Sequence, residues 1–115
     1  DVWLEKNGIP CVDIIKMDIE GGESAALRGM TRALKGARVL VTEFAPAWVE
    51  ASGNTSLSFL RSIERYGYEI STITEKGLVK LSPILNESFA SLLPKPRGGS
   101  HASEFLNLYC VKRKR

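Results

Sequence analysis

The sequence predicts an α/β fold in which a mostly parallel sheet is flanked by helices. Short apolar runs rich in β-branched residues, such as "VDIIKMDI" at 12–19, are typical of strands buried on both faces of a parallel sheet. The first two such runs are each followed by a segment with apolar residues at helical spacing. This strand–helix alternation, with further strands at the end, indicates right-handed crossovers and an antiparallel strand near the C-terminus.

The first unit runs from residue 12 to residue 36. After the strand at 12–19, the pair Gly21 and Gly22 supplies a tight turn, because glycine tolerates positive φ and lets a ligand approach the backbone. A helix is predicted over 23–35, and Gly36 is predicted to be its left-handed C-cap. The apolar face of this helix comprises Ala26, Leu27, Met30, Ala33 and Leu34.

The second unit repeats this order. A strand is predicted over 37–44, followed by a polar loop over 45–55. Thr55 or Ser56 is expected to be the N-cap of a helix that ends at Gly67. The apolar face of that helix comprises Leu57, Leu60, Ile63 and Tyr66.

The remaining third of the chain is predicted to be richer in strands. The runs at 68–74 and 77–82 suit a hairpin around the spacer Glu75-Lys76-Gly77. Ser82 and Pro83 resemble the start of a short helix over 83–93, which precedes a loop at 94–99. The last strand is predicted over 104–112.

Composition indicates one globular domain over residues 1–115. The chain is 43% hydrophobic and 25% charged, which is enough apolar material for a sizeable core. The first residue is Asp1 and not methionine, so we expect an excerpt from a longer protein. The sequence has no signal peptide pattern and no run of about 20 apolar residues, which favours a cytoplasmic protein without a membrane partner.

The net charge of +3 does not predict a nucleic-acid partner, because residues 112–115 are all basic and the rest of the chain is slightly acidic. Cys11 and Cys110 lie in or beside apolar runs, so both are expected to be reduced and packed as small hydrophobes. His101 is the only histidine, and no CxxC occurs, so no metal site of the zinc type is expected.

Acidic residues follow the first two predicted strands. Asp18 and Glu20 end the first strand, and Glu43 ends the second. In parallel sheets, ligands gather outside the carboxyl ends of the strands, so these side chains are expected to face one crevice. A phosphate is disfavoured because Glu20 and Glu23 flank the glycines. Carboxylates there suit hydroxyls, amines, a sulfonium or a metal ion.

Each acid also has a purely structural interpretation. Glu20 and Glu23 would favour a helix dipole, at about 0.3–1 kcal/mol each. Glu43 could pair with Arg38 or Lys16, whereas Asp18 within an apolar strand needs a partner to offset its desolvation. A histidine placed like His101 is more often an ordinary loop residue than a catalytic base.

The segments "VDIIKMDIEGGESAALRGM", "ARVLVTEF" and "LSFLRSIERYGYEI" resemble the C-terminal half of the FkbM-type family of S-adenosylmethionine-dependent methyltransferases. The most specific element is the block over 16–23. The resemblance extends over nearly the whole chain, from the helix-like start to the final "NLYCVKR". It implies a Rossmann-like, seven-stranded methyltransferase sheet to which this chain contributes the fourth to seventh strands.

This resemblance also implies an activity and a cofactor. The intact enzyme would transfer a methyl group from S-adenosylmethionine to a hydroxyl oxygen of a small-molecule acceptor. Asp18 is expected to act in catalysis and cofactor binding, with Glu20 as a second catalytic candidate. Glu43 and His101 are the expected substrate-binding residues. The glycine-rich turn and the ribose-binding acid of the family would lie before Asp1, so this chain alone is expected to bind the cofactor weakly or not at all and to be inactive.

Two other readings remain open. The chain could be a non-catalytic α/β interaction module, or Asp18, Glu20 and Glu43 could hold Mg²⁺. The implied sheet places the second strand between the first and the last, which separates the two cysteines. It also leaves the first strand with an open edge, so we expect a homodimer across that edge or pairing with the missing N-terminal half.

Overall fold

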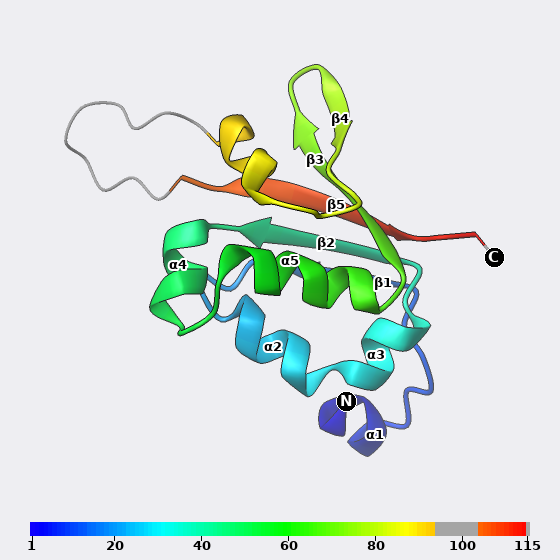
Figure 1. Ribbon diagram of the computed structural model, residues 1–115. Coiled ribbons are helices and arrows are strands. Elements are labelled where there is room, and N and C mark those ends of the chain that lie inside the picture. The colour runs from blue at the N-terminus through cyan, green and yellow to red at the C-terminus, as the bar shows by residue number, and fades with distance from the viewer. Residues whose placement is uncertain (94–103, 115) are drawn as a thin grey trace.

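The computed structural model describes residues 1–93 and 104–114 (Figure 1). Its elements alternate between helices and strands until the second half of the chain, where strands dominate. In chain order they are α1 (Val2–Lys6), β1 (Ile14–Met17), α2 (Glu23–Gly29), α3 (Thr31–Gly36), β2 (Val39–Phe44), α4 (Pro46–Ala51), α5 (Ser56–Arg65), β3 (Tyr68–Thr74), β4 (Gly77–Lys80), the 3-10 helix η1 (Glu87–Leu92) and β5 (Leu106–Lys112).

The strands form one sheet in the order β1-β2-β5-β3-β4. β1 and β2 are parallel, while β5 runs antiparallel to both β2 and β3. β1, β2 and β3 therefore run in one direction, as the α/β prediction requires. Because β5 separates β2 from β3, β1–β2 is the only parallel pair among the described strands. The expected α/β class, the antiparallel strand near the C-terminus and the β3–β4 hairpin are confirmed.

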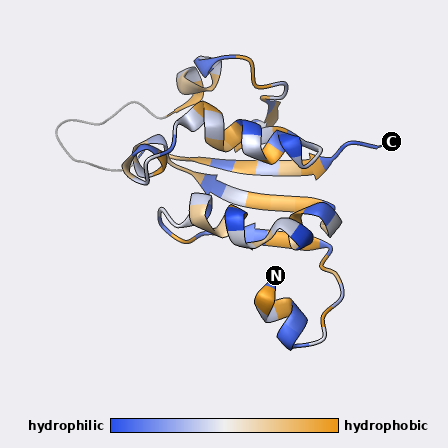
Figure 2. Cartoon of the chain, turned by 60° about the horizontal axis from the view of Figure 1, so that its bottom comes forward, coloured by the Kyte–Doolittle hydropathy of each residue, from blue (hydrophilic) through white to orange (hydrophobic). Residues whose placement is uncertain are grey.

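The core lies between one face of the sheet and the helices α2, α3 and α5, which lie on the same side of β2 in Figure 1. In β2, Leu40, Thr42 and Phe44 are buried while the alternate residues are only half-buried. This period of two is that of a strand with a single fully covered face. Figure 2 shows the hydrophobic residues concentrated along the strands, with mixed colours on the helices.

The helix α5 supplies the opposing apolar surface. Phe59, Leu60 and Ile63 are buried at helical spacing, and Phe59 stacks on Phe44 with ring centroids 5.6 Å apart. Thr55 is the N-cap, as predicted, because its hydroxyl accepts a hydrogen bond from the Ser58 amide at 3.1 Å. Gly67 follows the helix with φ of 86°.

The predicted helix over 23–35 is wrong in two respects. It is interrupted at Met30, which separates α2 from α3. The separate helix α3 has its own N-terminal cap, the distant Asp1. The Asp1 carboxylate accepts hydrogen bonds from the amides of Arg32 and Ala33 at 2.7 and 3.0 Å. Gly36 is the last residue of α3 and does not have positive φ, so it is not a left-handed cap.

Two further elements differ from the prediction. The supposed loop at 45–55 contains α4, whose first turn begins at Pro46. Pro83 does not start a helix, because the Ser82 hydroxyl accepts a hydrogen bond from the Ile70 amide of β3 at 2.8 Å. The later turn η1 is capped by Asn86 instead. The predicted loop at 94–99 lies outside the described residues.

Both cysteines are free thiols, and β2 separates β1 from the strand of Cys110. Cys110 is buried, and this burial raises its pKa to about 12. Cys11 is exposed, so the expected packing is wrong for it: β1 begins only at Ile14. In the described part of the chain, no helix is long and apolar enough to cross a membrane.

Candidate functional site

The register of β1 and β2 places two acids side by side. Ile14 pairs with Val39, and the ladder ends where Met17 pairs with Thr42. The next residue beyond this ladder is an acid on both strands: Asp18 directly follows β1, and Glu43 is the penultimate residue of β2. In a parallel pair, residues at the same register point to the same face, so these two carboxyl groups leave the sheet together. The structure thus brings together the side chains expected to share a crevice.

The pKa of Glu43 reports this crowding. It is raised above its ordinary value of 4.5, first by desolvation and then by a side-chain hydrogen bond with Asp18 and the charge of Asp18. The charges of Glu23 and Glu20 raise the pKa of Glu43 further. Four carboxyl groups therefore share one region at the carboxyl ends of β1 and β2. We call these four residues the acidic end of the sheet.

The turn after β1 is held by Glu23. This side chain is only 6% exposed, and its carboxylate accepts hydrogen bonds from the amides of Ile19 at 3.1 Å and Gly21 at 3.0 Å. Glu23 is thus a clamp on the turn, which goes beyond the helix-dipole role considered for it. Sequence reasoning missed this function, because hydrogen bonding back to the preceding turn has no periodic signal.

The backbone of this turn is unusual at Glu20. Its φ is +51°, and Gly21 follows with φ of +104°. Positive φ is uncommon for a residue with a side chain, and such residues concentrate at functional sites. Of the predicted glycine pair, Gly21 uses positive φ, while Gly22 has φ of −82°. The clamp by Glu23 keeps the turn in this conformation.

Trp48 of α4 covers the turn. A β-carbon added to Gly21 would lie 3.5 Å from the Trp48 β-carbon, so the turn and the helix are in close contact. The indole is half-buried beside the turn. Sequence reasoning did not select Trp48, although a tryptophan shortly after a strand carrying an acid at its carboxyl end is a usable signal.

Asp18 is more exposed than expected. β1 ends at Met17, so the expectation of an acid inside a buried strand is wrong, and the Asp18 side chain is 56% exposed. Its carboxylate lies 3.9 Å from Lys16 Nζ, and an exposed pair of this kind contributes about 0–1 kcal/mol. Glu43 forms no ion pair with Arg38 or Lys16 within the described ranges.

The remaining expectations concern His101 and a metal. His101 lies outside the described residues. Within residues 1–93 and 104–114, no group of three or more His, Cys, Asp and Glu side chains could hold a metal ion, so the magnesium reading gains no geometric support. The catalytic and binding roles of Asp18, Glu20 and Glu43 stay predictions.

Comparison with known proteins gives one match. The model of the methyltransferase FkbM domain matches residues 1–70, which extend from α1 into β3 and include the whole acidic end of the sheet. No curated protein and no solved structure matches the chain. The family match covers more than half of the sequence, and its range contains the resembling block at 16–23. The chain therefore belongs to the FkbM methyltransferase domain family.

Proposed function

We propose that this protein is an S-adenosylmethionine-dependent O-methyltransferase acting on a small-molecule hydroxyl, and that residues 1–115 are the C-terminal half of its catalytic domain. The observation that carries the proposal is the pairing of Asp18 with Glu43 at the carboxyl ends of parallel strands. This is where open α/β sheets bind their ligands.

The charges of the acidic end suit the cofactor. Asp18, Glu20 and Glu23 all raise the pKa of Glu43, so a cation placed among them would relieve their repulsion. S-adenosylmethionine, when bound, supplies an electrophilic methyl group on a positively charged sulfonium. Asp18 is the residue we assign to its positively charged part, because this carboxylate is exposed and its described ion pair with Lys16 is long.

The other acids suit the acceptor. A base for a hydroxyl proton works best when its pKa is raised toward the working pH, and Glu43 has such a shift. Glu20 projects from a turn that Glu23 holds rigid, which fits the positioning of a second hydroxyl. In this assignment, Asp18 orients, Glu43 lines the acceptor side and accepts a proton, and Glu20 assists.

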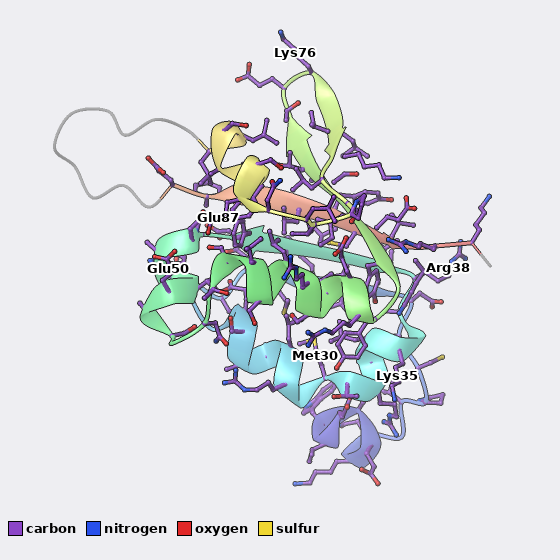
Figure 3. The ribbon with its side chains drawn as sticks, viewed as in Figure 1. Met30, Lys35, Arg38, Glu50, Lys76 and Glu87 are labelled. Carbon is purple, nitrogen blue, oxygen red and sulfur yellow. The ribbon has the colours of Figure 1, made fainter. Side chains whose placement is uncertain are left out.

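The test uses the protein together with the residues encoded before Asp1. Methyl transfer from labelled S-adenosylmethionine is measured over a panel of hydroxyl acceptors. Asp18→Asn should lower kcat/KM by about 100-fold or more, the effect of removing a positioned charged group from the reacting centre. The matched control is Glu50→Gln, an exposed acid of α4 in Figure 3, which should keep full activity. Full activity of Asp18→Asn would refute the assignment.

The same experiment separates the alternative function. A glycine-rich turn encoded upstream, with measurable transfer, supports the enzyme. An unrelated upstream domain without transfer supports the non-catalytic interaction module. Calorimetric titration of the 115-residue chain alone should show weak cofactor binding or none, and tight binding would contradict the proposal that half of the site is missing.

A further inference from the structure

A cleft lined by basic residues lies at the opposite end of the strands from the acidic end. It has a volume of about 690 Å³ and is lined by residues from α3, α5 and β5 and from the segments that follow α5 and β5. We call it the basic cleft. Its lining residues are Lys35, Arg65, Tyr66, Gly67, Lys112, Arg113 and Lys114, of which five are cationic and none is acidic.

The topology explains why these cations meet. Lys35 and Arg65 lie in the last turns of α3 and α5. The end of β5 reaches the same end of the sheet because Lys112 is in register with Tyr68, the first residue of β3. A cation in the last turn of a helix favours the helix dipole, which is reason enough for Lys35 and Arg65 individually. It does not explain why the basic end of β5 opens into the same cleft.

This cleft is separate from the candidate methyl-transfer site. Glu43 is in register with Asn107 of β5, five residues before Lys112. At about 3.4 Å per residue, the two ends of the sheet are roughly 17 Å apart along β5. An anion in the basic cleft would therefore contact none of the acidic residues.

The positive charge is poorly compensated within the described residues. Arg113 Nε lies 3.7 Å from Glu69 Oε1, but Glu69 also pairs with Lys80 at 3.2 Å. Lys35, Arg65 and Lys114 form no ion pair within residues 1–93 and 104–114.

Lys112 is fixed in place without an acid. Its ammonium group donates a hydrogen bond to the Tyr66 carbonyl and lies 4.2 Å from the centre of the Tyr68 ring. Burial lowers the pKa of Lys112, because desolvation disfavours its charged form. A bound anion would favour that charged form again.

A second cavity extends the positive surface. It has a volume of about 330 Å³, shares Arg65 and Arg113 with the basic cleft, and is also lined by Arg61 and by one acid, Glu64, whose carboxylate accepts a hydrogen bond from the Ile84 amide. The guanidinium of Arg61 is already committed to the carbonyls of Ile84 and Leu85. The shared arginines thus stand between two hollows, where their planar forks could contact separate oxyanions.

We propose that the basic cleft binds a small polyanion that carries at least two phosphate or sulfate groups. Five cations spread over one cleft match a ligand with more than one anionic group better than a single phosphate, and the volume lies within the range of about 300–1,000 Å³ typical of small-molecule sites. A concave site built from three elements fits a small molecule better than a duplex or a bilayer surface. The proposal is independent of methyl transfer.

The test is calorimetric titration of the 115-residue chain with inorganic tripolyphosphate at low salt. The double variant Lys35→Gln and Arg65→Gln should weaken binding by about tenfold or more, because each substitution removes a charge-assisted contact with the anion. Lys76→Gln is the matched control. Lys76 lies at the tip of the β3–β4 hairpin, far from Lys35 (Figure 3), and its loss should change affinity less than twofold.

Circular dichroism checks that each variant is folded. A further cleft variant, Lys114→Gln, changes a residue beyond the last strand and should lower the affinity for tripolyphosphate a few-fold. Equal losses in the cleft variants and in Lys76→Gln would reveal unspecific charge attraction and overturn the proposal. Undetectable binding of tripolyphosphate would also overturn the proposal. The same holds if a single-stranded oligonucleotide or anionic phospholipid vesicles bind tightly and tripolyphosphate does not displace them.

Discussion

At the scale of single residues, the crowding of carboxyl groups around Glu43 is the main electrostatic feature. Its pKa is raised by desolvation and by Asp18, so the folded chain holds this proton to a higher pH than the unfolded chain does. Between the ordinary and the raised pKa, the folded state binds more protons. The free energy of unfolding therefore falls as the pH rises through that window.

This linkage gives a prediction for Glu43→Gln. The neutral amide removes the repulsion, so the variant should have a higher Tm than the original chain at pH 7. The difference should shrink toward pH 4, where Glu43 is largely protonated in both states. Thermal unfolding at the two pH values, followed by circular dichroism, measures this. Glu50→Gln serves as the control, and an equal Tm change at both pH values would contradict the proposed cause.

At the scale of elements, the ends of the helices show which glycines matter. Gly67 has φ of 86° after α5, whereas Gly36 is the last residue of α3, without positive φ and without an atom within 4 Å of an added β-carbon. Gly36 follows Lys35 directly and Gly67 comes two residues after Arg65, so the sequence makes them look equivalent. In the structure, only Gly67 of the two has a backbone conformation that requires glycine.

The two glycines should respond oppositely to alanine. Gly36→Ala should stabilise the chain by about 0.5–1 kcal/mol, because the unfolded chain loses freedom while α3 keeps its conformation. Gly67→Ala should destabilise it by about 1–2 kcal/mol, the cost of left-handed backbone for a residue with a β-carbon. The midpoints of urea unfolding compare the pair directly. A loss of stability in Gly36→Ala would mean that α3 ends differently.

At the scale of the whole molecule, the two ends of the sheet differ in charge, and within the described residues one of its edge strands is left unpaired on its outer side. Its acidic end and its basic cleft lie at opposite ends of the strands, and β1 is an edge strand that pairs only with β2 among the described strands. Ile14 of β1 is 66% exposed. Unpaired backbone groups beside exposed apolar side chains favour pairing with another strand.

We therefore propose that the 115-residue chain self-associates as a two-fold dimer across β1, or requires its N-terminal half for solubility. Ile14→Lys should shift the chain toward monomer, since a charge at an open edge opposes strand pairing. Ile73→Lys is the matched control, because Ile73 is also exposed but belongs to the inner strand β3. Light scattering gives the mass, and a monomer before substitution would rule out the dimer.

The sequence by itself determined the fold class, most strands and the helix that became α5. It also determined the position of the acids at the carboxyl ends of β1 and β2. These features have local causes: alternation along β2, helical spacing in α5 and an acid at the carboxyl end of β1 and of β2. The resemblance to the FkbM family likewise depends on contiguous residues, and the match over residues 1–70 confirmed it.

The tertiary structure decided what depends on residues far apart in the chain. Asp1 caps α3 across 31 residues, Ser82 bonds to β3 instead of starting a helix, and Glu23 turns back to clamp the turn. The basic cleft joins α3, α5 and β5 in the same way. No periodicity or propensity encodes such long-range contacts, because they form only when packing of the core places the elements next to one another.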